Sequence, residues 1–240
     1  MGYWGELYLR STVPLLSPEV TAREVAYLAS SFAPVSGVIA DIGCGHGRHV
    51  SALEQGVLKG RVVGLEKDPQ SLRQRQGAFP AIQGDFLTLP FGAGALGGAY
   101  AWYSTLFVHD DRTNQAVLNA LGRSLRPGGR VVLQSVPFER LAEQPNAQFE
   151  GELPDGSKVK EKSRFDAKTG LDHGERQLTL PDGRELSGSY TIRYYPLPEL
   201  LTLLWGAGFT LRWAHGDLTG APPSAKSTDL IVGAEKTHGV

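Results

Sequence analysis

Short apolar runs alternate with segments of helical periodicity over the first 136 residues of the chain. Glycine, proline or charged residues bound the apolar runs, which is typical of buried strands. The strands predicted in this way lie at 37–41, 61–68, 81–86, 96–102 and 130–136. The helices predicted before and between them lie at 17–32, 48–56, 69–78 and 111–129. This alternation predicts an α/β fold in which right-handed crossover helices cover both faces of a parallel sheet.

Helix-boundary signals agree with this pattern. Ser17 is placed to cap the first helix, with Pro18 at its first position. Gly56 follows the second helix, and Pro69 opens the third. Pro127 and the two glycines after it end the fourth. The segment before Ser17 carries aromatic residues and prolines, and we interpret residues 1–18 as an N-terminal arm or lid.

The pattern changes after Pro137. Polar and apolar residues alternate over about 150–195, and the turn signals KTG and PDG interrupt them. This stretch predicts a small antiparallel β-excursion inserted into the α/β domain. The chain then returns to a helical pattern at 196–208. The segments 209–217 and 228–236 are predicted to form a closing pair of strands.

Composition narrows the class of protein. The 240 residues are 41% hydrophobic and 20% charged, which is ordinary for a globular domain. A net charge of −1 gives no overall attraction to nucleic acids or to anionic membranes. Cys44 is the single cysteine, which excludes an intrachain disulfide and favours a reducing compartment. The chain shows no secretory signal pattern and no run of 18 apolar residues, so we expect a cytoplasmic protein.

The stretch VIADIGCGHGRHV, residues 38–50, sets glycines at alternate positions directly behind a predicted strand. Glycines allow positive φ and let a ligand approach the main chain at the start of a helix. A dinucleotide fold would use G-x-G-x-x-G here, but Arg48 stands where its last glycine belongs. Asp41, two residues before Gly43, would repel a pyrophosphate and attract an ammonium. A ligand with an amino-acid end and a nucleoside end fits these residues better.

Two further strand ends carry acids. Glu66 follows Asp41 by 66 − 41 = 25 residues and ends the second strand, where an acid can bind both hydroxyls of a ribose. Asp85 can accept a hydrogen bond from an adenine amino group, and Phe86 can pack on the ring. Each residue also has a purely structural interpretation. Asp41 could be a turn residue, Glu66 a solvated strand end, Asp85 a helix cap and Phe86 a core residue.

Together these motifs resemble those of class I S-adenosylmethionine-dependent methyltransferases. VIADIGCGHG resembles the glycine motif, VVGLEKD the ribose-binding strand, QGDF the adenine loop, and LRPGGRVVL the turn before the fifth strand. The resemblance covers about residues 38–136. YLRSTVPLLSPEVTAREVAYL and the GRH after the glycines are similar to a bacterial small-molecule subgroup. The family's fold is a Rossmann-like three-layer sandwich with a mostly parallel seven-stranded sheet and an antiparallel last strand, which we expect over residues 1–240.

The resemblance implies S-adenosyl-L-methionine as cofactor, S-adenosyl-L-homocysteine as product, and transfer of a methyl group to a small molecule by in-line attack. It also implies a set of cofactor-binding residues. The methionine end is assigned to Asp41 and the backbone of Gly43, Cys44 and Gly45, the ribose to Glu66, the adenine to Lys67, Asp85 and Phe86, and further methionine contacts to the backbone of Ala101 and Trp102.

Acceptor contacts are expected beyond the carboxyl ends of the strands, from the arm, the loop after the fourth strand and the excursion. The candidates are Tyr3, Trp4, Tyr8, Trp102, Tyr103, His109, Arg193, Tyr194 and Tyr195. The methyl donor carries its own leaving group, so a general base is needed only where the acceptor must lose a proton. His109 is the best single candidate for that base, and no other catalytic residue is assigned.

Other functions are disfavoured by particular residues. AWYS after the fourth strand lacks the Asn/Asp-Pro-Pro-aromatic motif of exocyclic-base methylation, and no basic stripe indicates a nucleic-acid partner. Asp110, Asp111 and Asn114 are better explained as a helix start than as a metal site. Two alternatives stay open: a non-catalytic S-adenosylmethionine sensor or assembly protein, and a nicotinamide-dependent oxidoreductase. We expect a monomer or a homodimer with no membrane partner.

Overall fold

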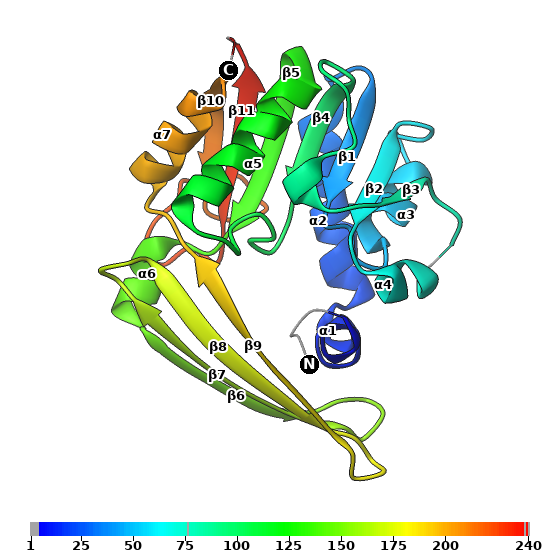
Figure 1. Ribbon diagram of the computed structural model, residues 1–240, viewed down its shortest axis with the longest axis vertical. Helices are drawn as coiled ribbons and strands as arrows, with labels where there is room; N and C mark the ends of the chain where they lie inside the picture. Colours follow the sequence, from blue (N-terminus) through cyan, green and yellow to red (C-terminus); the bar gives the residue numbers. More distant parts are fainter. Residues whose placement is uncertain (1–4, 76, 238, 240) are drawn as a thin grey trace.

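The computed structural model describes residues 5–75, 77–237 and 239. Tyr3 and Trp4, two of the acceptor-side candidates, lie outside these residues. A seven-stranded sheet forms the centre of the molecule, in the order β10-β11-β5-β4-β1-β2-β3 (Figure 1). Its strands are β1 Val38–Ile42, β2 Val62–Glu66, β3 Ala81–Gln83, β4 Leu96–Ala101, β5 Leu125–Ser135, β10 Phe209–His215 and β11 Leu230–Lys236.

Helices cover both faces of this sheet, as the alternating sequence predicts. On one face, α2 (Pro18–Phe32) and α3 (Arg48–Glu54) pack on a cluster of buried residues around Tyr100. On the other face, α5 (Asp111–Ser124) and α7 (Leu197–Gly206) enclose the larger cluster. Ser17 caps α2 by accepting from the backbone of Val20. The short α4 (Pro69–Arg73) follows β2.

The predicted three-layer fold is confirmed, including its last strand. β11 is antiparallel to both of its neighbours, β5 and β10, whereas the pairs among β5, β4, β1, β2 and β3 are parallel. One boundary differs from the prediction: residues 125–129 belong to β5 and not to the end of the preceding helix. Leu125 is buried and pairs with Leu96, so packing at the sheet outweighs the turn signal of the Pro-Gly-Gly sequence.

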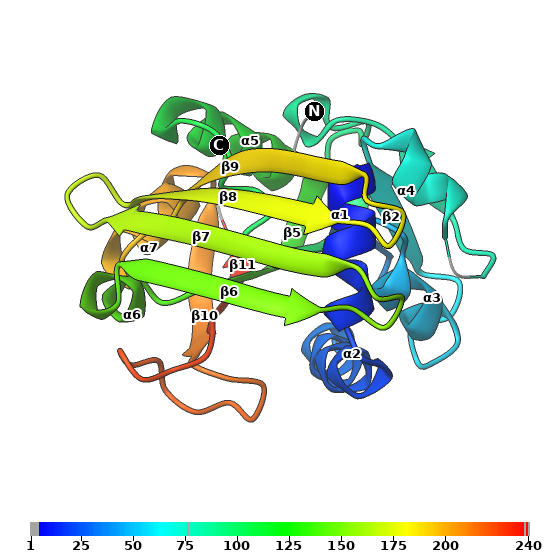
Figure 2. The same cartoon turned by 90° about the horizontal axis from the view of Figure 1, so that it is seen from below.

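A second sheet of four antiparallel strands follows β5, in the order β6-β7-β8-β9 (Figure 2). Its strands are β6 Asn146–Glu152, β7 Lys158–Asp166, β8 Leu171–Thr179 and β9 Glu185–Arg193. This sheet is the predicted excursion, and it begins at 146 instead of about 150. The unpredicted helix α6 (Phe138–Glu143) leads into it. Phe165 and Ile192 on its inner face pack against Val108 and Val136, which follow β4 and β5.

The N-terminal arm contains a helix that the sequence pattern did not reveal, α1 (Glu6–Ser11), and a 3-10 turn at Val13–Leu15. α1 lies between the two sheets at the carboxyl ends of the central strands (Figures 1 and 2). Leu7 packs on the four-stranded sheet with Val159 and Leu178. At the other end of α1, a Cβ built on Gly5 would lie 3.9 Å from a carboxylate oxygen of Asp68, just after β2. The described part of the arm therefore connects both sheets.

Candidate functional site

In the glycine turn after β1, the middle glycine has free space beside its Cα atom, whereas the two outer glycines are packed against side chains. Gly43, Gly45 and Gly47 all have positive φ, at 76°, 57° and 78°. A Cβ on Gly43 would lie 2.3 Å from the Thr105 side chain, and one on Gly47 would lie 1.8 Å from the Phe79 ring. A Cβ on Gly45 would meet none of the described atoms within 4 Å. The outer glycines thus permit close packing, whereas Gly45 leaves room for a ligand beside the main chain.

Asp41 lies near the end of β1 and is 3% exposed. Burial raises the pKa of its carboxyl to about 7; Tyr100 and Arg48 oppose this rise, and Glu66 adds to it. Two buried donors, the Tyr100 hydroxyl and Arg48 Nη2, have no hydrogen-bond partner among the described residues. The Asp41 carboxyl is suited to the ammonium end of an amino acid, because a nearby cation would favour its charged form.

Glu66 ends β2 and holds the glycine turn in place. Its Oε2 accepts a hydrogen bond from Gly45 N at 2.9 Å, and its Oε1 accepts one from Asp68 N at 2.8 Å. A carboxylate has about four acceptor positions, so these two bonds leave positions for ribose hydroxyls. Glu66 therefore has a structural role that the sequence did not show, and its predicted role stays compatible with it.

Asp85 has the capping role that was one of its two predicted roles. Its Oδ1 accepts from Leu87 N at 3.0 Å and caps the 3-10 turn Phe86–Thr88. Its Oδ2 forms an ion pair with Lys67 Nζ at 2.7 Å, although the Lys67 side chain is 74% exposed. Burial alone would raise the pKa of Asp85, but Lys67 and the Leu87 amide lower it below its ordinary value. Asp85, Lys67 and Phe86 thus lie together at the edge of the sheet next to β2, and their role in binding adenine stays a prediction.

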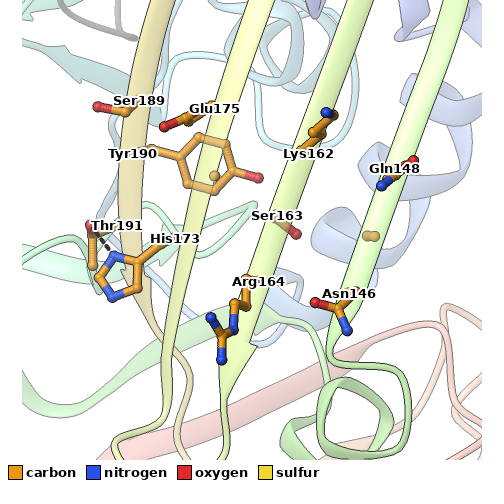
Figure 3. Close-up of a pocket in the computed structure, with 12 residues that line it drawn as sticks. Asn146, Gln148, Lys162, Ser163, Arg164, His173, Glu175, Ser189, Tyr190 and Thr191 are labelled. Carbon is orange, nitrogen blue, oxygen red and sulfur yellow. Dashed lines mark hydrogen bonds between the residues drawn. The ribbon is translucent and has the colours of Figure 1, made fainter.

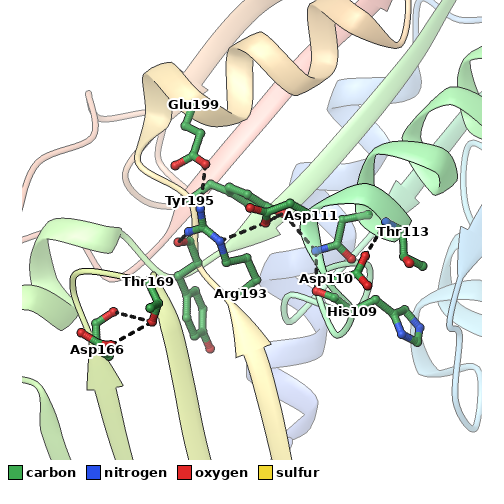
Figure 4. A network of polar contacts seen from close by, with 11 residues as sticks. His109, Asp110, Asp111, Thr113, Asp166, Thr169, Arg193, Tyr195 and Glu199 are labelled. Carbon is green, nitrogen blue, oxygen red and sulfur yellow. Dashed lines mark hydrogen bonds and ion pairs between the residues drawn. The ribbon is translucent and has the colours of Figure 1, made fainter.

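His109 lies beside Phe86, one of the residues predicted to contact adenine. Its imidazole stands edge-on to Phe86, with ring centroids 5.9 Å apart. Its main-chain oxygen accepts from Asn114 Nδ2 at 2.9 Å, and Asp110 caps α5 by accepting from Thr113 N (Figure 4). The structure therefore gives the HDD segment the helix-start role that the sequence favoured. The suggestion that His109 is a base stays a prediction, and its contact with Phe86 does not support it.

The loop after β4 is held in an unusual backbone conformation. Tyr103 and Ser104 are non-glycine residues with positive φ, at 54° and 56°. Gln134, near the end of β5, fixes both: its side-chain oxygen accepts from Tyr103 N at 2.6 Å, and its main-chain oxygen accepts from Ser104 N at 3.0 Å. Ala101 and Trp102 before them are buried, whereas the Tyr103 side chain is 41% exposed. Strain of this kind is often found at functional sites.

Glu24 is a buried residue of this region that the sequence reasoning missed. It lies on α2, is 4% exposed, and accepts from Trp102 Nε1 at 3.0 Å and from the Tyr103 hydroxyl at 2.7 Å. Its other oxygen accepts from Arg48 Nη1 at 2.5 Å and from His49 Nε2 at 3.0 Å. The signal was present, because Glu24 shares a helical face with Leu28, four residues later, which is fully buried.

Tyr8 is the candidate from the arm that falls within the described residues. Burial is the main cause that raises the pKa of Tyr103, the hydrogen bond to Glu24 adds to it, and Tyr8 contributes as a neighbour. Tyr8 also packs on the cluster that joins α1 to the four-stranded sheet. The structure thus brings Tyr8, Trp102 and Tyr103 to one side of the site.

Arg193, Tyr194 and Tyr195 connect the four-stranded sheet to the helices of the large sheet. Arg193 pairs with Asp111 at 3.1 Å and with Glu199 at 2.6 Å (Figure 4). The Tyr195 hydroxyl donates to the same Asp111 oxygen at 2.7 Å. Tyr194 packs with Phe165 and other residues of the cluster at the base of β9. All three have packing roles, and their predicted contact with an acceptor stays untested.

Cys44 packs inside the glycine turn, against β2. Its thiol is buried, and a Cβ on Gly64 would lie 2.5 Å from its sulfur. Burial, with Asp41 and Glu66 adding to it, raises the pKa of the thiol well above its ordinary value. A thiol that stays protonated is a poor nucleophile.

A separate groove lies on the solvent face of the four-stranded sheet (Figure 3). It contains cationic and anionic side chains together, among them Lys162, Arg164 and Glu175, and His173 Nδ1 lies 3.0 Å from Thr191 Oγ1. None of the sequence-predicted site residues lies in this groove. Within residues 5–75, 77–237 and 239, no group of His, Cys, Asp and Glu side chains is arranged for a metal ion. No helix of the described chain is long and apolar enough to cross a membrane.

Part of the chain matches a family of known proteins. Residues 39–129, from β1 into β5, match the family described as a methyltransferase domain. The matched segment contains the glycine turn and the carboxyl ends of β1, β2, β3 and β4, where the candidate site lies.

Individual relatives agree with this family. The chain is 32% identical over 143 residues to the O-methyltransferase cnsE of Penicillium expansum, which covers 55% of this chain and 49% of that protein. The match thus spans about half the length of this curated relative. The CcbJ methyltransferase of Streptomyces caelestis has a TM-score of 0.81 at 19% identity, over 97% of this chain and 96% of its own. CalS10 of Micromonospora echinaspora, an amino pentose methyltransferase solved with S-adenosylmethionine, has a TM-score of 0.69 at 17% identity, over 99% of both chains. At such low identities, the two structures show a shared fold.

Proposed function

We propose that the protein transfers a methyl group from S-adenosyl-L-methionine to a small-molecule acceptor. The observation that carries this proposal is the gathering of three strand-end acids at one edge of the sheet, next to an open glycine backbone. Asp41 would hold the amino end of the cofactor, Glu66 the ribose, and Asp85 with Phe86 the adenine. The open space beside Gly45 and the buried carboxyl of Asp41 both fit such a ligand.

The cofactor supplies an electrophilic sulfonium methyl group with its own leaving group. Formation of the bond from the acceptor atom to that carbon would be balanced by cleavage of the carbon–sulfur bond, with the neutral thioether S-adenosyl-L-homocysteine as the leaving group. The residues of this chain contribute alignment of the acceptor with that carbon, and exclusion of water. Any proton that the acceptor loses passes to solvent or to a nearby base.

The acceptor would lie between the loop after β4, the arm and the four-stranded sheet. Tyr103, whose side chain is 41% exposed, and its neighbour Tyr8 offer aromatic rings there, which suit a small molecule and can also attract a cation through the ring faces. An amino pentose is the acceptor that the description of CalS10 names, which supports a small-molecule acceptor here as well. We propose that the protein acts in the cytoplasm, as a monomer or a homodimer.

Ligand-dependent thermal stability tests the cofactor assignment. A ligand that binds only the folded protein raises its melting temperature in proportion to the logarithm of its concentration over Kd. We expect S-adenosylhomocysteine to raise the melting temperature and NADH to leave it unchanged. The reverse result would identify a nicotinamide-binding protein and overturn the proposal.

Methyl transfer itself separates an enzyme from the alternative, a non-catalytic sensor. Incubation with S-adenosylmethionine labelled in its methyl group, and with a panel of small hydroxyl and amine metabolites, should label at least one metabolite. Stabilisation by S-adenosylhomocysteine without labelling of any compound would favour the sensor.

A further inference from the structure

One buried carboxylate joins three separate segments of the chain around the proposed site. Glu24 of α2 receives hydrogen bonds from Trp102 and Tyr103, in the loop after β4, through its Oε1. It receives them from Arg48 and His49, at the start of α3, through its Oε2. Each oxygen therefore accepts hydrogen bonds from one segment, and the carboxyl group of α2 bridges the loop after β4 and the start of α3.

The hydrogen-bond donors around the two oxygens of Glu24 favour the ionised form of its carboxyl group. Burial alone would raise the pKa of Glu24, but His49, Arg48 and Tyr103 together outweigh it and lower the pKa to about 2. Burial lowers the pKa of His49, so its imidazole is neutral near pH 7 and donates from Nε2. Glu24 thus stays ionised near pH 7. Its negative charge is balanced by the positive charge of Arg48, so this buried group has no net charge.

The two bridged segments belong to opposite halves of the proposed site. Arg48 directly follows the glycine turn, and its charge acts on Asp41, the proposed ligand of the cofactor's amine. Trp102 and Tyr103 lie on the acceptor side, where the backbone of Tyr103 has a positive φ of 54°. The Arg48 guanidinium also lies over the Tyr103 ring, 5.4 Å from its centroid, so both segments meet directly at Glu24.

We infer that Glu24 is a positioning residue that fixes the loop after β4 relative to the glycine turn, and so sets the placement of acceptor against cofactor. The part of this inference that concerns cofactor and acceptor rests on the proposed function. The bridge between Arg48 and Trp102 is a property of the chain alone. Both parts can be tested without knowledge of the acceptor.

The variant Glu24→Gln removes one acceptor oxygen and keeps the shape of the side chain. The amide nitrogen of glutamine must then face donors on one side, which breaks the bridge. We expect S-adenosylhomocysteine to bind this variant roughly tenfold more weakly by calorimetry, as for the loss of one charge-assisted hydrogen bond.

Glu54→Gln is the matched control. Glu54, the last residue of α3, also accepts several hydrogen bonds, from the backbone of Gly60, Arg61 and Val62 at 2.8, 3.0 and 2.6 Å. Its loss should lower the melting temperature without a change in affinity for S-adenosylhomocysteine. Equal affinity in wild type and in both variants would overturn the positioning role of Glu24.

A spectroscopic measurement tests the bridge independently of ligand binding. The indole N–H resonance of Trp102, assigned with Trp102→Phe, reports its hydrogen bond to Glu24. We expect Arg48→Met to shift this resonance in the wild-type background and to leave it unchanged in the Glu24→Gln background. A shift of equal size in both backgrounds would show that Glu24 does not carry the link. If the wild type fails to bind S-adenosylhomocysteine, the proposed function falls, while this measurement still decides the bridge.

Discussion

Buried charge is arranged differently at the carboxyl edge of the large sheet and on the inner face of the small one. At the large sheet, Asp41 is buried with a raised pKa, and two donor atoms, the Tyr100 hydroxyl and Arg48 Nη2, lack hydrogen-bond partners among the described residues. On the small sheet, Glu161 accepts from both Arg176 and Tyr190, the latter at 2.7 Å. Arg176 also donates to hydroxyl groups of the arm, so this ion pair holds α1 in place.

The difference indicates what each region is for. A buried polar group without a partner is costly, and proteins keep such groups where a ligand completes them. A fully bonded network gives rigidity and fixes the packing of neighbouring segments. We therefore expect changes at the large-sheet edge to act on cofactor affinity, and changes on the small sheet to act on stability and on the placement of the arm.

Asp41→Asn should give the largest effect. It removes the charge proposed to hold the cofactor's amine, and a hydrogen bond to a charged group contributes roughly 1.5–3 kcal/mol, so affinity for S-adenosylhomocysteine should fall at least tenfold. The same change should raise the melting temperature at pH 8, because the folded wild type must there bury a charged carboxylate. Calorimetry and thermal unfolding measure the two effects. Weaker binding accompanied by a lower melting temperature would instead indicate a damaged fold.

The pH dependence of binding isolates the same carboxyl group in the unmodified protein. With its pKa raised to about 7, Asp41 is largely protonated at pH 6 in the ligand-free protein, and binding of an ammonium must release that proton. Affinity for S-adenosylhomocysteine should therefore rise with pH and level off above 7, with a slope approaching about tenfold per pH unit below it. Burial, together with Arg48 and His49, lowers the pKa of the neighbouring His46 to about 4, so His46 does not titrate in this range. Asp41→Asn should abolish the slope, and a slope that persists would assign the titration to another group.

Glu66→Gln should have a smaller effect. Glutamine can still accept one backbone hydrogen bond, from Gly45 or from Asp68, but it loses the charge that favours ribose hydroxyls. We expect a loss of affinity of several-fold, on the order of 1 kcal/mol. Adenosine and 2′,3′-dideoxyadenosine, compared as competing ligands of S-adenosylhomocysteine, locate the effect. The variant should discriminate less between them than the wild type, and unchanged discrimination would place the ribose elsewhere.

The sequence predicted the large sheet well because its chemistry is local. Asp41, the glycines after it, Glu66 and Asp85 each stand at the end of a strand, and parallel strands bring such ends to one edge. The position of each residue in its own strand is therefore enough to predict that these residues meet at the same edge of the sheet. The two alternative roles of Asp85, capping a helical turn and binding adenine, were also both predicted from local pattern. The structure shows the capping hydrogen bond from Leu87 N.

The acceptor side could not be predicted in the same way. Glu24 acts through donors that lie 24, 25, 78 and 79 residues further along the chain, and no local pattern marks that meeting. Arg193 and Tyr195 looked like candidates because they are polar or aromatic residues at the end of the excursion. Their partners Asp111 and Glu199 belong to other elements, so the packing role became visible only in three dimensions.

Asp172→Asn should have the smallest effect and is the sharpest test of the difference between the sheets. Asp172, on β8, is 5% exposed, and its Oδ1 has no hydrogen-bond partner in the described structure. Burial raises its pKa, with Ser163 opposing and Glu161 adding to the rise. It therefore shares the burial of Asp41, but it lies on an inner strand of the small sheet, with Phe165 and Ile192 as its cross-strand neighbours, and not beside the open backbone of the glycine turn.

The folded state holds the Asp172 proton more tightly than the unfolded state. The wild type therefore loses stability as the pH rises above the pKa that Asp172 has in the unfolded chain. Asp172→Asn should remove this loss and raise the melting temperature more at pH 8 than at pH 4.5. Asp182→Asn is a control of opposite sign, because Arg184 lowers the pKa of that exposed acid. Affinity of Asp172→Asn for S-adenosylhomocysteine should equal that of the wild type. A loss of affinity comparable to that of Asp41→Asn would show that the small sheet also supplies a charge to the cofactor, and the division between the two regions would fail.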